Sequence, residues 1–104
     1  MGLLDILFGS KNDSVNFKEL VGDGAKIIDV RTPDEYSGGH INNAVNNPLD
    51  TLKSKFGNLK KDQTIIVYCA SGVRSSSAKK MLELNGFTHV YNGGGISKLE
   101  SMLK

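Results

Sequence analysis

The segment "QTIIVYCASGVRSSSAKKMLELNG", residues 63–86, decides the fold of this chain. It begins with an apolar run that ends at Cys69 and continues through a short loop of small residues. Its last part has the apolar spacing of a helix, which Gly86 closes. An apolar strand that leads directly into a helix is typical of a parallel sheet with both faces covered.

The same alternation continues on both sides of this segment. "KIIDV", residues 26–30, predicts a second buried strand, and "TPDEY" after it predicts a helix. Thr32 suits the N-cap, Pro33 suits the first helical position, and Glu35 completes a capping box. Further strands are predicted at 43–48 and 88–92, further helices at 49–57 and 96–104, and a turn at Gly93–Gly95.

This element order predicts an α/β fold with a small parallel sheet and helices on both faces. In such folds the active site lies beyond the carboxyl ends of the strands. Cys69 is predicted at the end of the most apolar, and therefore central, strand. Its position is the first indication of function.

Composition limits the class of protein. The 104 residues suit one compact domain, and the contents of 38% hydrophobic and 23% charged residues are those of a globular protein. A net charge of +2, from basic residues spread along the chain, argues against a nucleic-acid-binding protein. A single cysteine excludes an internal disulfide and favours the cytoplasm as the location.

The N-terminal stretch "MGLLDILFGS" is apolar but carries Asp5 and stops after Phe8. It is too short for a membrane span and lacks the basic start of a signal peptide. Residues 1–13 are predicted to be an apolar segment that caps the fold or, less favoured, meets a partner. Residues 14–104 are predicted to form the domain.

The loop after Cys69 has the residues of an anion-binding cup. Small side chains and Gly72 permit a tight turn, whose backbone N–H groups point inward at the start of a helix. Such a cup stabilises a thiolate and makes Cys69 a candidate nucleophile. Arg74 is predicted to clamp an anionic substrate, while Ser76 and Ser77 are predicted to cap the helix. The predicted substrate-binding residues are Ala70, Ser71, Gly72, Val73, Arg74 and Ser75.

The same residues have other interpretations. A lone cysteine is often an inert core residue, and cysteine phosphatases and arsenate reductases use similar loops. The phosphatase spacing C-x5-R is not met, because only four residues separate Cys69 from Arg74. Asp29 and Arg31 are possible supporting residues, with a structural ion pair as the favoured interpretation. A hydrogen bond that stabilises its loop is favoured for His40, and no cluster has metal-ligand spacing.

Three blocks of the sequence resemble the rhodanese family. "CASGVRS" resembles its C-x-x-G-x-R loop, "IIDVRTPDEYSGGHINNAVNNP" resembles its D-V-R…G-H-I signature, and "VYNGGGISKL" resembles its C-terminal segment. The resemblance covers most of the chain from about Phe17 onward. It implies a sulfurtransferase in which Cys69 takes sulfane sulfur from a small anionic donor such as thiosulfate and passes it to cyanide, a thiol or a protein acceptor. It implies no metal and no organic cofactor.

A second hypothesis is that the chain is not primarily an enzyme. Cys69 is then loaded with sulfur or oxidised, and the chain acts as a persulfide carrier or a redox-regulated binding module with little turnover of its own. The apolar N-terminal segment would suit a partner protein. Steady turnover with thiosulfate and cyanide separates the two hypotheses.

Overall fold

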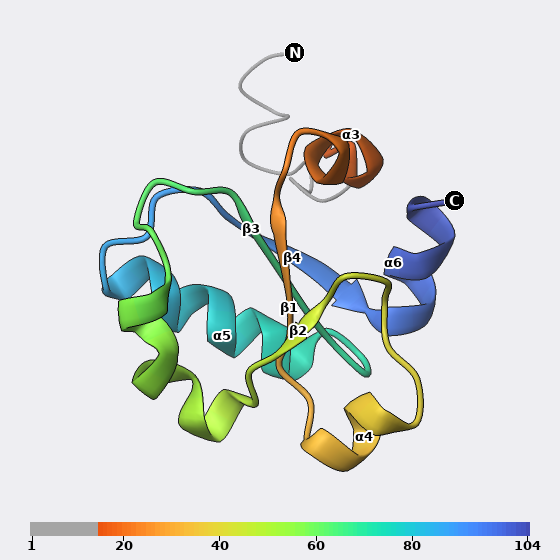
Figure 1. The fold of residues 1–104 in the computed structure, drawn as a ribbon, viewed down its shortest axis with the longest axis horizontal. Helices are drawn as coiled ribbons and strands as arrows, with labels where there is room; N and C mark the ends of the chain where they lie inside the picture. Colours follow the sequence, from red (N-terminus) through yellow and green to blue (C-terminus); the bar gives the residue numbers. More distant parts are fainter. Residues whose placement is uncertain (1–14) are drawn as a thin grey trace.

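The four strands form one parallel sheet, which lies at the centre of a computed structural model that describes residues 15–104 (Figure 1). They are β1 (Lys26–Asp29), β2 (Val45–Asn46), β3 (Ile65–Cys69) and β4 (Val90–Gly95). Their order in the sheet is β2-β1-β3-β4, and all three pairs are parallel. The strand that carries Cys69 is therefore an interior strand, as the sequence predicted.

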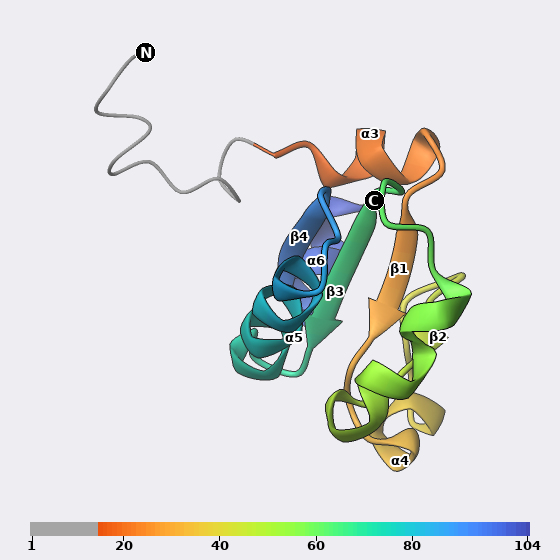
Figure 2. The same ribbon diagram turned by 90° about the vertical axis from the view of Figure 1, so that its left-hand side faces the viewer.

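Helices cover both faces of the sheet. Figure 1 shows α5 and the green η1 on one side of the strands, with α3 and α6 on the other. Figure 2 shows the strands running side by side. The predicted α/β class with two covered faces is confirmed. The helices are α3 (Phe17–Gly22), α4 (Pro33–Ser37), the 3-10 helix η1 (Leu49–Asn58), α5 (Val73–Leu84) and α6 (Ile96–Met102).

Burial on both faces explains the continuous apolar run of β3. Ile65, Val67 and Cys69 pack in the core beneath α5 and η1. Ile66 and Tyr68 pack in the opposite core, which contains side chains from α3 and α6. Because successive residues of a strand point to opposite faces, a strand between two cores needs apolar residues at every position. The nucleophile candidate and its neighbour Tyr68 therefore belong to different cores.

The predicted capping box at the start of α4 is present. Thr32 Oγ1 accepts from the Glu35 N–H at 3.2 Å, and Glu35 Oε1 accepts from the Thr32 N–H at 2.9 Å. Pro33 begins the helix, where a missing N–H costs nothing. Two otherwise unpaired donors are satisfied, so this short helix begins at a fixed residue.

The predicted turn at Gly93–Gly95 is wrong, because these residues continue β4. Val67 pairs with Asn92 and Tyr68 with Gly94, so Gly93 is the extra residue of a bulge. A Cβ on Gly93 would lie 2.8 Å from Leu99 Cδ2. These glycines thus permit close packing of a strand, rather than a reversal of the chain.

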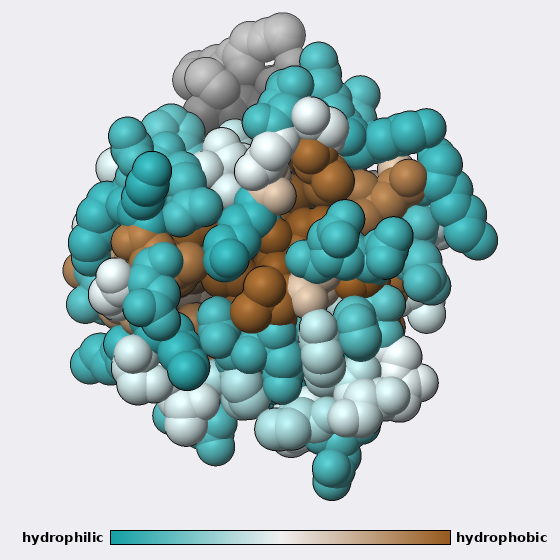
Figure 3. Space-filling model, in the orientation of Figure 1, coloured by the Kyte–Doolittle hydropathy of each residue, from teal (hydrophilic) through white to brown (hydrophobic). Residues whose placement is uncertain are grey.

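Apolar surface forms a band across the middle of the view in Figure 3, on both sides of the strands. A pocket with a volume of about 320 Å³ has apolar walls that include Val21, Ile27, Ile41 and Leu103. The predicted N-terminal segment, residues 1–13, lies outside the described residues. Across residues 15–104, no helix combines the length and the apolar character needed to cross a membrane.

Candidate active site

Cys69 is the last residue of β3, at the carboxyl edge of the sheet. Its side chain is only 1% exposed, in the core beneath α5. Ala70 and Ser71 follow on the surface, and α5 begins at Val73. The predicted junction of strand, loop and helix is present, and it brings the thiol to the first turn of α5.

Gly72 makes this tight junction possible. It has a φ of +102° and occupies the N-cap position of α5, where no side chain caps the helix. A Cβ at Gly72 would lie 3.3 Å from Gly94 Cα, so both the backbone conformation and the space favour glycine. The predicted capping role of Ser76 and Ser77 is wrong, because both lie within α5 and are exposed.

The sulfur of Cys69 receives several hydrogen bonds. The Gly72 N–H donates to Sγ at 3.0 Å and the Ser75 N–H at 3.4 Å, while Ser75 Oγ also lies 3.4 Å from Sγ. Burial raises the pKa of the Cys69 thiol. The Ser75 hydroxyl and N–H, with the N–H groups of Gly72 and Ser71, outweigh burial and hold the pKa below its ordinary value. The loop therefore favours a thiolate.

Asn92 is a site residue that the sequence analysis missed. It lies on β4, and its Oδ1 accepts from Ser75 Oγ at 2.7 Å and from the Gly94 N–H at 2.8 Å. Its Nδ2 donates to Gly72 O at 3.3 Å. The only signal in the sequence is a polar residue before three glycines, at the end of a predicted strand. Asn92 thus joins β4 to the loop at Gly72 and to the first turn of α5 at Ser75.

Arg74 is paired with a carboxylate. Its guanidinium donates to Glu35 Oε1 at 2.7 Å and to Glu35 Oε2 at 3.0 Å. Glu35 lies in the first turn of α4. This bond to Arg74, aided by the Thr32 N–H, lowers the pKa of Glu35 to about 2. The sequence analysis placed Arg74 at the site but did not identify Glu35 as its partner. Both side chains are about one-third exposed, at the mouth of the loop.

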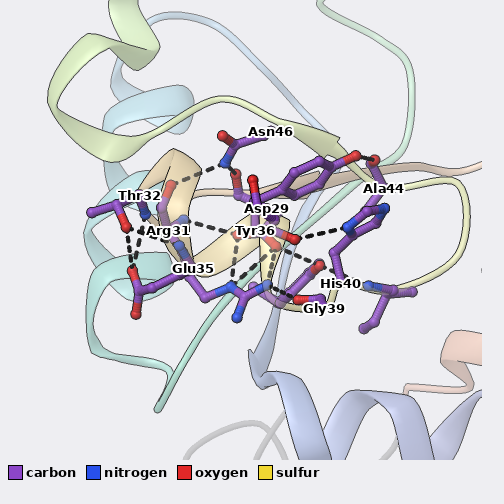
Figure 4. A network of polar contacts seen from close by, with 12 residues as sticks. Asp29, Arg31, Thr32, Glu35, Tyr36, Gly39, His40, Ala44 and Asn46 are labelled. Atoms are coloured by element: carbon purple, nitrogen blue, oxygen red, sulfur yellow. Dashed lines mark hydrogen bonds and ion pairs between the residues drawn. The ribbon is translucent and has the colours of Figure 1, made fainter.

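Asp29 and Arg31 form a buried ion pair, as the favoured interpretation predicted. Arg31 Nη2 lies 2.7 Å from Asp29 Oδ2, and Nε lies 3.0 Å from Oδ1. Figure 4 shows the guanidinium between Asp29 and Gly39, whose carbonyl oxygen accepts from Nη2 at 2.6 Å. The pair fixes the segment after α4 to the end of β1, so its role is structural.

Tyr68 connects this ion pair to the strand that carries Cys69. Its hydroxyl donates to Asp29 Oδ2 at 2.6 Å and accepts from the Ile41 N–H at 3.0 Å. His40 stacks on Tyr36, and its Nδ1 lies 2.9 Å from Tyr36 O. The predicted loop-stabilising contact of His40 is confirmed. The bonds of Tyr68 therefore join the segment after α4 and the end of β1 to β3.

A pocket with a volume of about 230 Å³ adjoins Arg74. Val30, Pro48 and Leu49 form its apolar walls, and Thr32 and Asp50 also line it. It gives a small molecule a place to lie beside the mouth of the loop. Among residues 15–104, no three His, Cys, Asp or Glu side chains are grouped as metal ligands would be.

Comparison with known sequences identifies relatives of this chain. A family model, the rhodanese-like domain, matches residues 14–101. The thiosulfate sulfurtransferase PspE of Escherichia coli is 39% identical over 74 residues, which are 69% of this chain and 71% of that protein. The uncharacterized protein YqhL of Bacillus subtilis is 42% identical over 77% of this chain. The chain spans 64% of the length of YqhL.

Solved structures agree with this relationship. A rhodanese from Escherichia coli, solved with anions, has a TM-score of 0.69 and 38% identity, over 72% of this chain and 91% of that one. A rhodanese-like domain protein from Staphylococcus aureus has a TM-score of 0.72 and 34% identity, over 85% and 86% of the two chains. By its sequence, its fold and its cysteine loop, this chain belongs to the rhodanese-like domain family.

Proposed function

We infer that this chain is a sulfurtransferase that carries sulfane sulfur as a persulfide on Cys69. The observation that carries this proposal is the set of donors around Sγ: the N–H groups of Gly72 and Ser75 point at the sulfur from the loop and the first turn of α5. Donors of this kind stabilise an anionic sulfur before and after transfer. Membership of a family with relatives named as sulfurtransferases supports the same reaction.

The reaction has two steps. The Cys69 thiolate attacks the outer sulfur of thiosulfate, the S–S bond of the donor breaks, and sulfite leaves with the bonding electron pair. The enzyme then carries an extra sulfur atom on Cys69, and this outer sulfur bears the negative charge. Cyanide or a thiolate attacks that outer sulfur, and the Cys69 thiolate is restored as the leaving group. This is double-displacement catalysis. The proposal requires no metal or organic cofactor.

The residues of the loop divide this work. We expect the backbone N–H groups of the segment from Ala70 to Ser75 to surround the outer sulfur, and the small residues Ala70, Ser71 and Gly72 to leave it accessible. Arg74 can donate to the anionic donor at the mouth of the loop once its guanidinium is released from Glu35. Val73 is 72% exposed and faces an incoming acceptor. A reducing compartment such as the cytoplasm keeps the thiol free for this chemistry.

A persulfide carrier that serves a partner protein is the second candidate. The charge of Arg74 is balanced by Glu35, so a thiosulfate dianion meets little net positive charge at the loop. The exposed Val73 and the apolar pocket beside Arg74 offer contacts to a protein. Relatives also include a tRNA uridine(34) hydroxylase from Buchnera aphidicola, 34% identical over 69% of this chain but only 25% of that protein. Rhodanese-like domains are thus also found within larger enzymes.

Mass spectrometry of the intact protein after incubation with thiosulfate tests the proposal. Wild type is expected to gain the mass of one sulfur atom, which cyanide removes as thiocyanate. Cys69→Ala is expected to gain nothing. Ser77→Ala, an exposed position on α5, is the matched control and should load as wild type does. An unloaded wild type with a titratable thiol would contradict thiosulfate as donor. Loading without steady turnover would favour the carrier, and hydrolysis of an aryl phosphate would favour a phosphatase.

A further inference from the structure

The buried hydroxyl of Ser75 lies between two groups that compete for its one proton. Its oxygen is 2.7 Å from Asn92 Oδ1 and 3.4 Å from Cys69 Sγ. Ser75 is fully buried, so water does not supply a second donor or acceptor. A serine hydroxyl can donate only one hydrogen bond at a time. The direction of that bond must therefore depend on what the sulfur carries.

The orientation of the Asn92 amide is fixed by its neighbours. The Gly94 N–H donates to Oδ1 at 2.8 Å, and Gly72 O accepts from Nδ2 at 3.3 Å. Exchanging the two amide atoms would set the NH2 group against the Gly94 N–H and oppose two oxygens at Gly72. The atom that faces Ser75 is thus an acceptor. In this arrangement the Ser75 proton lies on the bond to Asn92.

This arrangement fits a cysteine whose Sγ carries no negative charge, which is either a thiol or a persulfide. A thiol S–H can donate to Ser75 Oγ while Ser75 donates to Asn92, which gives a chain of bonds in one direction. A thiolate has no proton to donate, and the lone pairs of Ser75 would then face an anion. Rotation of the hydroxyl about Cβ–Oγ removes this repulsion and supplies a charge-assisted bond to Sγ. Asn92 keeps its bond from the Gly94 N–H throughout.

We propose that Asn92 is a positioning residue that holds the Ser75 hydroxyl while Cys69 is a thiol or persulfide and releases it to Sγ when the sulfur is a thiolate. The Ser75 hydroxyl thereby donates to Sγ only while Sγ carries the negative charge. That charge is on Sγ before the first step and on the outer sulfur after it. The part of the proposal that concerns the persulfide rests on the proposed function. The part that concerns the free thiol does not.

The charged groups near the loop stay constant in the alanine variants that test this proposal. Arg74 on α5 is paired with Glu35 on α4, and Asp29 at the end of β1 is paired with Arg31. No change to Ser75 or to Asn92 alters these pairs. Since the chain contains one cysteine, alkylation by iodoacetamide reports on Cys69 alone. The pH dependence of the alkylation rate gives the pKa of the thiol without any sulfur donor.

Four proteins form the experiment: wild type, Asn92→Ala, Ser75→Ala and the double variant. Asn92→Ala frees the hydroxyl for the sulfur, so the ratio of thiolate to thiol is expected to rise about fivefold at a given pH, the effect of one hydrogen bond. Ser75→Ala removes the donor, and the ratio is expected to fall by about the same factor. In the Ser75→Ala background, Asn92→Ala should change the ratio less than about twofold.

Two results of this experiment would overturn the proposal. If Asn92→Ala shifts the thiol pKa by the same amount with and without the Ser75 hydroxyl, Asn92 acts only through the fold and the proposal is overturned. A fall in thiolate in Asn92→Ala would overturn it as well. If Asn92→Ala does not fold, the near-isosteric Asn92→Asp replaces it. Its carboxylate holds the Ser75 proton more firmly, so it must lower the thiolate ratio more when Ser75 is present than when residue 75 is alanine.

Failure of this proposal is distinguishable from failure of the proposed function. The alkylation cycle needs no thiosulfate, so it gives its answer even if wild type never gains sulfur. Loading of Asn92→Ala, measured by mass, then tests the persulfide half. Faster formation of the persulfide at low pH is expected, because more of the cysteine is thiolate. An unchanged loading rate, with a raised thiolate ratio, would overturn that half alone.

Discussion

Replacing Tyr68 by phenylalanine removes one oxygen atom from the interior of the protein. That hydroxyl donates to Asp29 Oδ2 at 2.6 Å and accepts from the Ile41 N–H at 3.0 Å. Tyr68 is fully buried, and burial is the main reason why its pKa is raised above the ordinary value. The phenylalanine ring fills the same space, so the change acts on hydrogen bonds and not on packing.

The magnitude follows from the groups that lose a partner. Asp29 keeps its bonds to Arg31, but the Ile41 N–H is left without an acceptor in a buried position. An unsatisfied buried donor costs about 1–3 kcal/mol, and the lost bond to a carboxylate adds about 1.5–3 kcal/mol. We expect the free energy of unfolding to fall by about 3 kcal/mol, which lowers the Tm by roughly 12–24 °C for a domain of this size.

Urea unfolding and a thermal melt measure this loss. Tyr91→Phe is the matched control, because its half-buried side chain on β4 makes the same chemical change with an expected effect below about 0.5 kcal/mol. The urea dependence of unfolding should be unchanged in both variants. A Tyr68→Phe protein that is as stable as the control would refute the view that this network holds the end of β1 against β3.

Two further substitutions test the loop and its ion pair. Gly95→Ala places a Cβ 2.7 Å from Ala70 O, so we expect the free energy of unfolding in urea to fall by about 1–3 kcal/mol and persulfide loading, measured by mass, to slow. Gly57→Ala, with no atom within 4 Å of its Cβ, is the control and should keep the stability and the loading rate of wild type. Normal loading of Gly95→Ala would count against this reasoning. The pKa of Glu35, held at about 2 chiefly by Arg74, lies below the ordinary 4.5, so its contribution to stability is complete above pH 4.5 and is lost as the pH falls towards 2. Glu35→Gln keeps the capping box and should flatten stability measured across that pH range, whereas an unchanged slope would contradict the pairing.

The sequence was sufficient to predict the features that depend on interactions between residues close together in the chain. In the capping box Glu35 lies three positions after Thr32, and this spacing is readable without a structure. The strand that ends at Cys69 is apolar at every position, which is enough to predict burial on both faces. The loop and the start of α5 follow from the small residues after Cys69. These features depend on neighbours in the chain, so the sequence contains their cause.

Long-range partners were not predictable in the same way. Glu35 lies 39 residues from Arg74, and the sequence offers several other acidic residues as partners. Asn92 reaches Ser75 only because β4 pairs beside β3 with a bulge at Gly93. The three glycines were interpreted as a turn because turns and close packing both require glycine. The register of the sheet, which the sequence does not specify, decides between the two.

The burial of Cys69 has a consequence for which molecules the protein can meet. With 1% of Cys69 exposed, the sulfur offers an approaching molecule almost no area. Two copies of the chain are therefore poorly placed to join through their cysteines. A small donor such as thiosulfate is favoured over a folded partner for as long as the thiol is empty. The added sulfur atom projects beyond the cysteine, so loading changes the range of molecular sizes to which this residue responds.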